Sequence, residues 1–511
     1  MTTATPVPAD LQARRRNALL LGSVFVVAAC GLVYELVAGA LSSYLVGSSV
    51  TQFSIVIGLF MFAMGIGSFL SRYVVRDALR SFVAIEIAVG AAGGLSALVL
   101  FYAFTFLPVY VPFLVASTLL VGTLVGLEIP LVIRVLRERE ALSNAVSSVL
   151  ALDYVGALIG SLLFPLVLVP WLGLIRSAFL FGLLNVGVAG LALWRLGDEM
   201  AHPKRLRWIA GVTALGLSAG LITAGGLTRF AEDRLYQDEI LLARDTPYQR
   251  IVVTRWRDDL RLFLDGHLQF SSADEARYHE SLVQPVLAAV PGATRVLILG
   301  GGDGMAAREV FKHSRVQRVD LVDLDPAVTT LFTERDMLSR LNQGAFRDPR
   351  MHLHHMDAAR FLEDSRESWD VILVDLPDPS SPALARLYSD SFYKLIDKHL
   401  TAEGALVTQA TSPYYSADAF WCIVDTLRSR FKVWPYHVNV PSFGEWGFAL
   451  ASRRDIAVAD LHLGLSLNFL NDATLQGLFV FPGDLQRPPA IEVNHLDRPV
   501  LVRYYERGWQ R

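Results

Sequence analysis

Residues 296–304 read Val296-Leu-Ile-Leu-Gly-Gly-Gly-Asp-Gly304, and this stretch decides the fold of the second half of the chain. The four apolar residues predict a buried parallel strand. Four glycines follow and let the backbone turn tightly against a ligand, namely Gly300, Gly301, Gly302 and Gly304. A helical pattern then begins at Met305, so backbone N–H groups face the end of the strand. This order indicates a nucleoside-containing ligand on a Rossmann-like sheet.

A second strand lies about twenty residues further on and ends in carboxylates, among them Asp323. A carboxylate at that place suits the two hydroxyls of a ribose. The pattern alone does not separate NAD from S-adenosyl compounds. Asp303 is the unusual residue of the glycine run, because a carboxylate there would repel a pyrophosphate and attract a cationic ligand.

Apolar strands and helical patterns alternate through the rest of this half. They predict a doubly wound, Rossmann-like α/β domain over 276–455, a fold class that NAD-binding domains and S-adenosylmethionine-dependent methyltransferases share. Expected strands lie at 295–299, 318–323, 351–355, 370–375, 404–409, 433–438 and 446–452, with helices at 304–312, 326–341, 358–363, 389–399 and 416–430. A small antiparallel β unit over 231–275 precedes the domain, behind a polar linker at 228–245, and a C-terminal extension over 456–511 follows it.

Composition divides the chain of 511 residues into two unlike parts. Residues 1–230 hold long apolar runs with 15 Lys and Arg against 10 Asp and Glu, a net charge of +5. The remainder holds 31 against 39, a net charge of −8, which argues against nucleic acid as a partner. The two cysteines, Cys30 and Cys422, give no metal-binding spacing, and Cys30 lies in an apolar run, so a disulfide is not expected.

The first part is expected to be a bundle of about seven transmembrane helices over 1–230. Each apolar segment is near the roughly 20 residues that cross a bilayer. The segments lie at about 18–40, 50–71, 81–107, 109–133, 145–169, 173–194 and 207–227. Basic residues mark one side of the membrane, namely Arg14, Arg15, Arg16, Arg72, Arg76, Arg80, Arg134, Arg137, Arg139, Arg195, Lys204, Arg205 and Arg207. This predicts a multi-pass protein of the cell (inner) membrane with its N-terminus in the cytoplasm.

If the seventh segment spans the bilayer, the polar half of the chain lies outside the cytoplasm. The segment is rich in Gly, Ala and Ser, so an interfacial or re-entrant position is an alternative. We expect a cytoplasmic catalytic half, in tension with the charge pattern.

Four acids interrupt the apolar segments: Glu35, Glu86, Glu128 and Asp153. An ionised carboxylate at the centre of a membrane helix costs roughly 2.5–3.5 kcal/mol. Three interpretations are open. The acids pair with Tyr34, Tyr154 or serines and tie the bundle together, they line an acidic cavity for a cation, or they form a proton path.

The residues that could perform chemistry lie in Trp369-Asp-Val-Ile-Leu-Val-Asp-Leu-Pro-Asp-Pro379. A strand delivers Asp375 to its C-terminal end, where ligands bind in open α/β sheets, and Asp378 follows on a turn. With Asp303 they make three acids around one pocket, which favours a polyamine-like substrate over an anion. Asp357 ends a third strand, where such a carboxylate commonly receives an adenine amino group. The nearby His352, His354 and His355 lack a completing ligand, so no metal site is expected.

A set of motifs in the second half, in their order and spacing, resembles the spermidine synthase (polyamine aminopropyltransferase) family over about 236–453. The motifs are Gln249, Leu264-Asp-Gly266 with Gln269, Asp274-Glu275, Tyr278-His-Glu280, Gly300-Gly-Gly-Asp-Gly304, Arg308-Glu-Val310, Asp375-x-x-Asp-Pro379 with Pro382, Phe392-Tyr393, Gln409 and Trp446-Gly-Phe448. The first half is similar to that of bacterial members fused to a multi-pass membrane domain.

The resemblance implies transfer of an aminopropyl group from decarboxylated S-adenosylmethionine, a co-substrate, to putrescine, without a prosthetic group. Spermidine and methylthioadenosine would be the products. Asp375 would be the base that deprotonates the attacking amine, and Asp303 would grip the amine of the aminopropyl group. The diamine would be held by Asp378, His279, Tyr278 and Gln269. The nucleoside would be lined by Gln249, Asp323, Asp357, Ala358 and Pro382. A homo-oligomer, dimer or tetramer, is also implied.

The chain departs from the family pattern at several of these positions. Leu376 and Pro377 stand where serines are usual, and Val440 stands where a tyrosine is common. Asp323 replaces a glutamate and Ala358 replaces a glycine. The acids are kept while the amine pocket is reshaped, so the reaction class is better defined than the acceptor.

Two other functions compete with aminopropyl transfer. A methyltransferase would use the same kind of sheet, but Asp303 would oppose the carboxylate of intact S-adenosylmethionine. A polyamine transporter or sensor with a binding-only second half would account for the intramembrane acids.

Overall fold

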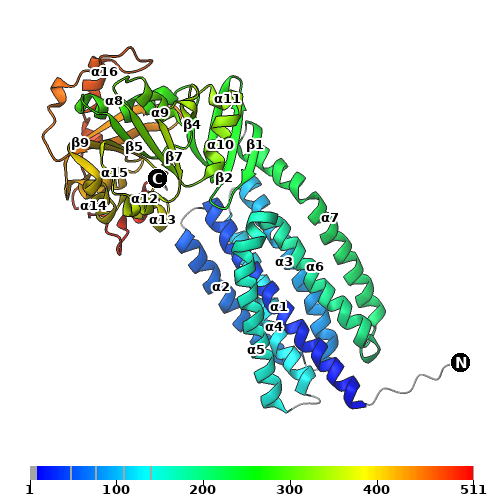
Figure 1. The fold of residues 1–511 in the computed structure, drawn as a ribbon. Helices are drawn as coiled ribbons and strands as arrows, with labels where there is room; N and C mark the ends of the chain where they lie inside the picture. The colour runs from blue at the N-terminus through cyan, green and yellow to red at the C-terminus, as the bar shows by residue number, and fades with distance from the viewer. Residues whose placement is uncertain are drawn as a thin grey trace. The chain divides into compact units, whose positions relative to one another are not determined.

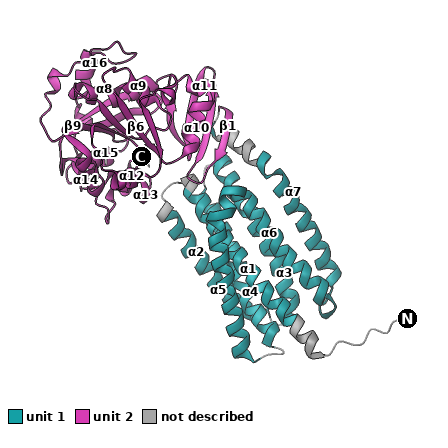
Figure 2. Cartoon of the chain, viewed as in Figure 1, with its two compact units in different colours: residues 1–237 teal, residues 238–511 magenta. Residues whose placement is uncertain are grey.

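The computed structural model describes residues 9–46, 49–74, 77–107, 110–137, 141–236 and 238–509. Two of the basic residues used to predict the membrane orientation, Arg76 and Arg139, lie outside these ranges. The chain forms two compact units, residues 1–237 and residues 238–511 (Figure 2). Figure 1 labels the elements of both units.

The first unit is entirely helical in its described residues. Its helices are α1 (Ala9–Val46), α2 (Ser49–Leu70), α3 (Ala78–Phe106), α4 (Val111–Arg137), α5 (Leu142–Leu163), α6 (Val169–Leu196) and α7 (Pro203–Tyr236). By length and composition, six helical runs in the described part could cross a bilayer. One of these runs, Leu142–Glu199, has 58 residues and holds both the fifth and the sixth predicted segments. A π-helical turn at Phe164–Leu168 and the left-handed backbone of Gly173 (φ 73°) interrupt it.

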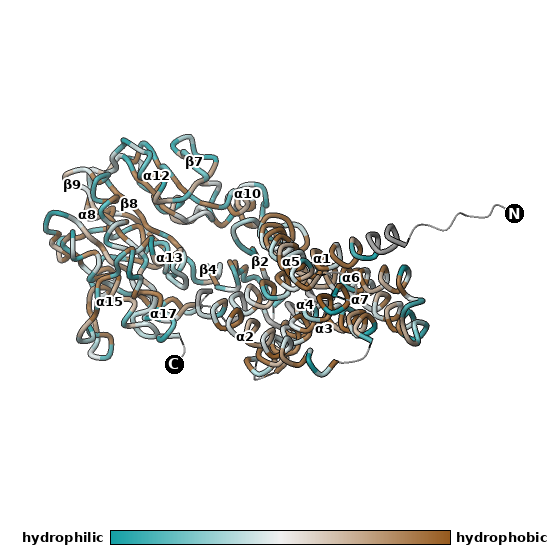
Figure 3. Tube along the Cα trace, turned by 90° about the horizontal axis from the view of Figure 1, so that it is seen from below, coloured by the Kyte–Doolittle hydropathy of each residue, from teal (hydrophilic) through white to brown (hydrophobic). Residues whose placement is uncertain are grey.

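The exterior of the first unit is apolar. Large hydrophobic side chains such as Trp171, Trp208 and Ile222 are 71–81% exposed. Figure 3 shows hydrophobic residues along most of these helices. Soluble proteins seldom expose so much contiguous apolar surface, so this exterior is compatible with insertion into a bilayer. The helix α7 is continuous, and its stretch Pro203–Gly226 is among the runs long and apolar enough to span.

The second unit is built on a seven-stranded sheet, which confirms the predicted α/β fold. The strand order is β10-β11-β9-β8-β5-β6-β7. The strands are β5 (Arg295–Gly300), β6 (Arg318–Asp323), β7 (Met351–His355), β8 (Trp369–Asp375), β9 (Leu400–Gln409), β10 (Lys432–Val440) and β11 (Gly444–Ser452). Strands β5 to β9 are parallel, while β11 is antiparallel to both of its neighbours.

Both faces of this sheet are buried. Val296 and Ile298 of β5 pack into one hydrophobic cluster, and Leu297 and Leu299 pack into another on the opposite face. Such runs are hydrophobic at every position because helices cover both sides of a parallel sheet. The covering helices are α8 (Glu275–Ala289), α9 (Met305–Phe311), α12 (Ala358–Asp364), α13 (Pro382–Ala385), α14 (Asp390–His399) and α15 (Ala417–Arg428). Two further helices, α10 (Pro326–Glu334) and α11 (Asp336–Ser339), pack into a separate cluster with residues 251–270.

A four-stranded antiparallel sheet precedes this fold in the second unit. Its strands are β1 (Glu239–Asp245), β2 (Arg250–Trp256), β3 (Asp259–Leu264) and β4 (His267–Ser271), in that order. The prediction of a polar linker over 228–245 was wrong. The helix α7 continues to Tyr236, and residues 239–245 form β1, whose charged and half-exposed residues pair with β2.

The C-terminal extension belongs to the same compact unit. It contains two short 3-10 turns, Val458–Asp460 and Gly483–Leu485, and the helices α16 (Asp472–Leu478) and α17 (Val500–Trp509). Leu475 of α16 joins the core on one face of the large sheet, and Leu501 and Tyr505 of α17 join the core on the other. The extension therefore covers both faces of the sheet.

Candidate active site

The glycine loop after β5 brings the main chain against the end of β8. Gly300 has a φ of +86°, and a Cβ atom there would lie 2.0 Å from the carbonyl oxygen of Asp375. The N–H of Gly301 donates to that same oxygen at 3.2 Å. Only glycine permits this approach. The loop therefore sets the position of Asp375 at the carboxyl edge of the sheet.

Asp303 is held at the end of this loop. Its Oδ1 accepts a hydrogen bond from the N–H of Met305 at 2.8 Å, and Asn342 donates to its carbonyl oxygen at 2.8 Å. Its Oδ2 lies 4.0 Å from Nε2 of His279. The hydrogen bond at Oδ1 thus restrains the side chain, whereas Oδ2 faces the site.

Asp375 is the last residue of β8. The hydroxyl of Tyr278 donates to its Oδ1 at 2.7 Å. Burial raises the pKa of Asp375 to about 6, and the nearby Asp303 acts in the same direction, while His279 and the Tyr278 hydroxyl oppose the rise. A carboxylate with such a pKa is ionised at neutral pH and is a better proton acceptor than an exposed one.

His279 supplies a buried positive charge beside these acids. Its Nδ1 lies 2.9 Å from Oε2 of Glu275, one helical turn earlier in α8. Burial works against protonation, but the bond to Glu275 and the carboxylates of Asp303 and Asp375 outweigh it and raise the pKa of His279 to about 9. The imidazolium is therefore the charged form at neutral pH, with one N–H directed to Glu275.

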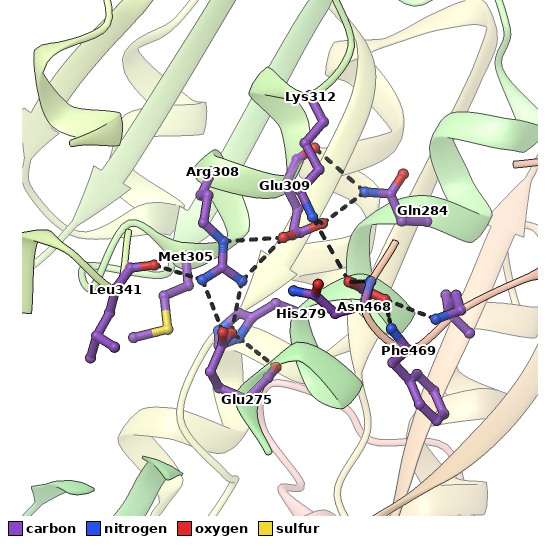
Figure 4. A network of polar contacts seen from close by, with 12 residues as sticks. Glu275, His279, Gln284, Met305, Arg308, Glu309, Lys312, Leu341, Asn468 and Phe469 are labelled. Carbon is purple, nitrogen blue, oxygen red and sulfur yellow. Dashed lines mark hydrogen bonds and ion pairs between the residues drawn. The ribbon is translucent and has the colours of Figure 1, made fainter. Parts of the chain in front are cut away.

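A chain of ion pairs holds Glu275 in turn (Figure 4). The guanidinium of Arg308 donates to both oxygens of Glu275, at 2.9 and 2.8 Å. Although burial opposes it, the pairing with His279 and Arg308 lowers the pKa of Glu275 to about 2. Arg308 also reaches Glu309, which Lys312 and Gln284 contact from the other side. This network joins α8 to α9 behind the acids.

Asp378 lies on the turn after β8, within a second set of donors. The hydroxyl of Tyr505 donates to its Oδ2 at 3.0 Å, and Gln409 and Thr411 lie at 3.4 and 3.5 Å. Burial raises the pKa of Asp378 to about 6, and these three donors limit the rise. Gln409 also donates to the carbonyl oxygen of Leu376 at 2.7 Å, so the turn is braced from β9.

Asp323 ends β6 beside the glycine loop. A Cβ atom on Gly302 would lie 2.5 Å from Oδ2 of Asp323, and Oδ1 accepts the N–H of Asp325 at 2.9 Å. Burial raises the pKa of Asp323 to about 6, with Asp325 and Asp303 adding to the effect. Gln249, the residue before β2, reaches this corner, because its amide donates to Asp325 at 3.2 Å.

The other residues expected at a nucleoside are placed around the next strand. Asp357 caps α12 by accepting the N–H groups of Ala359 and Arg360, and it pairs with Arg386. Ala358, the first residue of α12, is buried, and Pro382 begins α13 one turn before Arg386. Gln269 lies on β4, where its amide donates to the carbonyl of His267 at 3.1 Å.

The structure therefore joins one group of predicted residues by direct contacts. Tyr278, His279, Asp303 and Asp375 form a contiguous set, with Asp323 across the glycine loop. Sequence reasoning missed Thr411 and Tyr505, both of which reach Asp378. Thr411 has a φ of +58°, which is a strained value for a β-branched residue. No sequence pattern predicts this conformation. Tyr505 lies outside the stretch of recognised motifs.

The four acids of the apolar helices are placed unequally in the first unit. Glu86 of α3 and Glu128 of α4 are 0% and 3% exposed, whereas Glu35 and Asp153 are half-buried. Both carboxylate oxygens of Glu86 and one of Glu128 lack a hydrogen-bond partner among the described residues. The buried hydroxyl of Tyr34 is likewise unpaired within the described part. Tyr154 is 70% exposed. Pairing with tyrosines or serines was one of three interpretations of these acids, and among the described residues Tyr34 makes no such hydrogen bond while Tyr154 faces outward.

Comparison with known proteins gives consistent matches. The spermine/spermidine synthase domain family matches residues 275–460. The chain is 49% identical to polyamine aminopropyltransferase 1 of Ralstonia nicotianae, with 99% of each chain covered. It is 46% identical to the polyamine aminopropyltransferase of Leptospira interrogans, covering 96% of this chain and 98% of that one. Among solved structures, spermidine synthase from Thermotoga maritima matches with a TM-score of 0.44 and 25% identity, over 48% of this chain and 85% of that one.

The charge on His279 predicts a pH dependence of stability. Its pKa is about 9 in the folded protein against an ordinary value near 6.5. Protonated His279 thus stabilises the folded protein by about 3 kcal/mol. This contribution is complete below pH ~6.5 and is lost as the pH rises through ~9. We expect the melting temperature of the full-length protein in detergent to fall over this interval and the fall to flatten in His279→Gln. His462→Gln, at an exposed site, is the control, and an unchanged slope in His279→Gln would contradict the assignment.

Proposed function

Because the chain belongs to the polyamine aminopropyltransferase family, we propose that it transfers the aminopropyl group of decarboxylated S-adenosylmethionine to putrescine. The products are spermidine and methylthioadenosine. The observation that carries this proposal is the gathering of Asp303, Asp375 and Asp378, all largely enclosed, around the end of β8. Such a site attracts a cationic donor and a cationic acceptor and repels anions.

The reaction needs a neutral amine as nucleophile, yet a free amine is protonated near neutral pH. In our proposal Asp375 accepts this proton while the amine attacks the carbon next to the sulfonium of the donor. Its pKa of about 6 suits this role. The carbon–sulfur bond breaks as the new carbon–nitrogen bond forms, and the electron pair stays on the sulfur of methylthioadenosine. Fixed alignment of the two substrates supplies much of the rate.

The other residues take supporting roles in this proposal. Asp303 binds the amine of the aminopropyl group, and Asp378, Tyr278 and Gln269 hold the diamine. The nucleoside is lined by Gln249, Asp323, Asp357, Ala358 and Pro382. We revise one expected role, that of His279 as a diamine ligand. A buried imidazolium would repel an ammonium group, so we assign His279 to balancing the charge of Asp303 and Asp375.

A methyltransferase function is disfavoured by two independent points. The relatives with the same full-length architecture are named polyamine aminopropyltransferases. In addition, Asp303 would oppose the carboxylate of intact S-adenosylmethionine, since only its Oδ1 accepts a backbone N–H and its Oδ2 is turned to the site.

The substitution Asp375→Asn tests the proposed base. It keeps the side-chain volume but removes the proton acceptor, so we expect turnover with putrescine to fall about a hundredfold or more. Donor binding should change little. Purified protein in detergent is given decarboxylated S-adenosylmethionine and putrescine, and spermidine and methylthioadenosine are measured by mass spectrometry. Asp364→Asn, at an exposed position, is the matched control. Full activity in Asp375→Asn would refute the role.

For the first unit we propose anchoring in the cell membrane, with the catalytic unit in the cytoplasm and a dimer or tetramer as the assembly. Six helical runs are long and apolar enough to span, and the exterior of the unit is apolar. We expect both substrates in the cytoplasm, and because they are charged they do not cross a bilayer unaided. A cytoplasmic site therefore gives direct access to them. This orientation requires that α7 lie along the membrane surface or otherwise not complete a crossing.

Reporters fused after Arg511 test the orientation. We expect a green fluorescent protein at this position to fluoresce and an alkaline phosphatase to be inactive, because the first matures in the cytoplasm and the second outside it. The same two reporters fused after Phe106 serve as a comparison on a loop of the first unit. An active phosphatase after Arg511 would place the catalytic unit outside and show that α7 crosses the bilayer.

A second candidate function, cation binding by the membrane unit, is favoured by one observation. Glu86 and Glu128 are buried with unpaired carboxylate oxygens, an arrangement that burial makes costly unless a proton or another cation is bound. A role in moving polyamines would follow if that cation is a substrate.

Uptake and export of labelled spermidine by cells test this second function. Glu86→Gln and Glu128→Gln remove the charge with little change in volume, so a cation carrier should lose most of its transport. Asp375→Asn is the control that stops synthesis without touching the membrane unit. Unchanged transport in both glutamate variants would exclude the carrier.

A further inference from the structure

The C-terminal extension reaches the acceptor side of the active site. The match to the synthase domain ends at residue 460, whereas α17 lies at Val500–Trp509. Its Tyr505 is 7% exposed and places a hydroxyl 3.0 Å from Oδ2 of Asp378. This is the shortest of the three side-chain contacts to that carboxylate, since Gln409 and Thr411 lie at 3.4 and 3.5 Å.

Two buried polar anchors hold the extension in place. The carboxylate of Glu280, 0% exposed, accepts the backbone N–H groups of Asn468, Phe469 and Leu470 at 2.8–2.9 Å. Near the other end, the amide of Asn494 donates to the carbonyls of Ala385 and Tyr388 at 2.8 and 3.2 Å. Buried groups of this kind are costly to leave unpaired, so the path of the extension is strongly specified.

The last helix is also fitted closely to the loop beside the site. A Cβ atom on Gly508 would lie 2.5 Å from Oγ of Ser416, so α17 approaches this residue as only glycine allows. The ring of Trp509 stacks on that of Tyr415, with centroids 5.3 Å apart and planes at 23°. These contacts leave Tyr505 little freedom to turn away from Asp378.

We propose that Tyr505 is a positioning residue for the acceptor amine. By holding Oδ2 of Asp378, it orients the carboxylate so that Oδ1, which Gln409 contacts only at 3.4 Å, receives the non-reacting ammonium group of a diamine. The inference rests on the proposed function, in which Asp378 binds the acceptor. It deepens that function by making the C-terminal extension part of the acceptor pocket.

The physical consequence of removing the hydroxyl follows from the burial of Asp378. The charged and polar groups near this carboxylate are Tyr505, Gln409 and Thr411, with the hydroxyls of Tyr278 and Tyr388 further off. Loss of the strongest donor makes the ionised form less favourable, so the pKa of Asp378 rises above about 6. Acceptor binding is then weaker at neutral pH. As the pH is lowered, it is lost at a higher pH than in the unmodified protein.

Steady-state kinetics of Tyr505→Phe and of Tyr504→Phe test the inference. Both rings are buried in the same helix, but the Tyr504 hydroxyl faces Glu492 and not the site. For Tyr505→Phe we expect a rise in the acceptor KM of about ten- to hundredfold, the range for a hydrogen bond to a charged group. We expect kcat and the donor KM to stay within about twofold. The acid limb of kcat/KM for the acceptor should move to higher pH, and Tyr504→Phe should behave as the unmodified protein.

The acceptor is the diamine with the highest kcat/KM among diaminopropane, putrescine and cadaverine, so that the result does not depend on putrescine. The substitution Asp378→Asn tests the role of Asp378 separately from that of Tyr505. If it leaves the acceptor KM unchanged, the proposed acceptor site itself is wrong, and the role of Tyr505 falls with it. If it raises the acceptor KM while Tyr505→Phe does not, only the inference about Tyr505 is overturned. Equal effects of Tyr504→Phe and Tyr505→Phe would also overturn it, since they would reflect packing alone.

Discussion

The second unit depends on one constraint: several carboxylates are buried together at the carboxyl edge of a parallel sheet. Burial disfavours the charge on each of them, which is why the pKa values of Asp323, Asp375 and Asp378 are all raised to about 6. One protonated side chain, His279, offsets part of this charge. The remaining negative charge has no partner of equal strength among the described residues, and a bound cation would complement it.

The helix α8 organises this arrangement because three successive residues point in three directions. Tyr278 donates to Asp375, His279 lies between Glu275 and Asp303, and Glu280 binds the C-terminal extension. Successive helical residues are rotated by about 100°, so one short segment reaches the site, the supporting ion pairs and the tail. Arg308 fixes the base of this helix through its two bonds to Glu275. The catalytic edge and the extension are therefore parts of one polar framework.

The first unit also buries carboxylates. Glu86 and Glu128 are enclosed among apolar helices, and among the described residues both oxygens of Glu86 and one of Glu128 lack a hydrogen-bond partner. Such carboxylates are costly to keep as anions. Packing of the apolar helices does not require these carboxylates, and each of them adds a free-energy cost to the unit.

The sequence by itself determined the α/β sheet, the glycine loop and the acids, because buried strands and turn glycines have local signals. The strands β6 and β7 begin and end at the predicted residues, 318–323 and 351–355. It did not reveal β1, whose residues 239–245 are charged at both ends, or the antiparallel direction of β11, which side-chain alternation does not encode. It predicted the acids around Asp375, but not which partners they have.

Only the tertiary structure decided these partnerships, because they join residues that are distant in the chain. Tyr505 and Asp378 are 127 residues apart, and Glu280 and Leu470 are 190 apart. The fold alone brings such pairs within hydrogen-bonding distance, and burial then decides their charge.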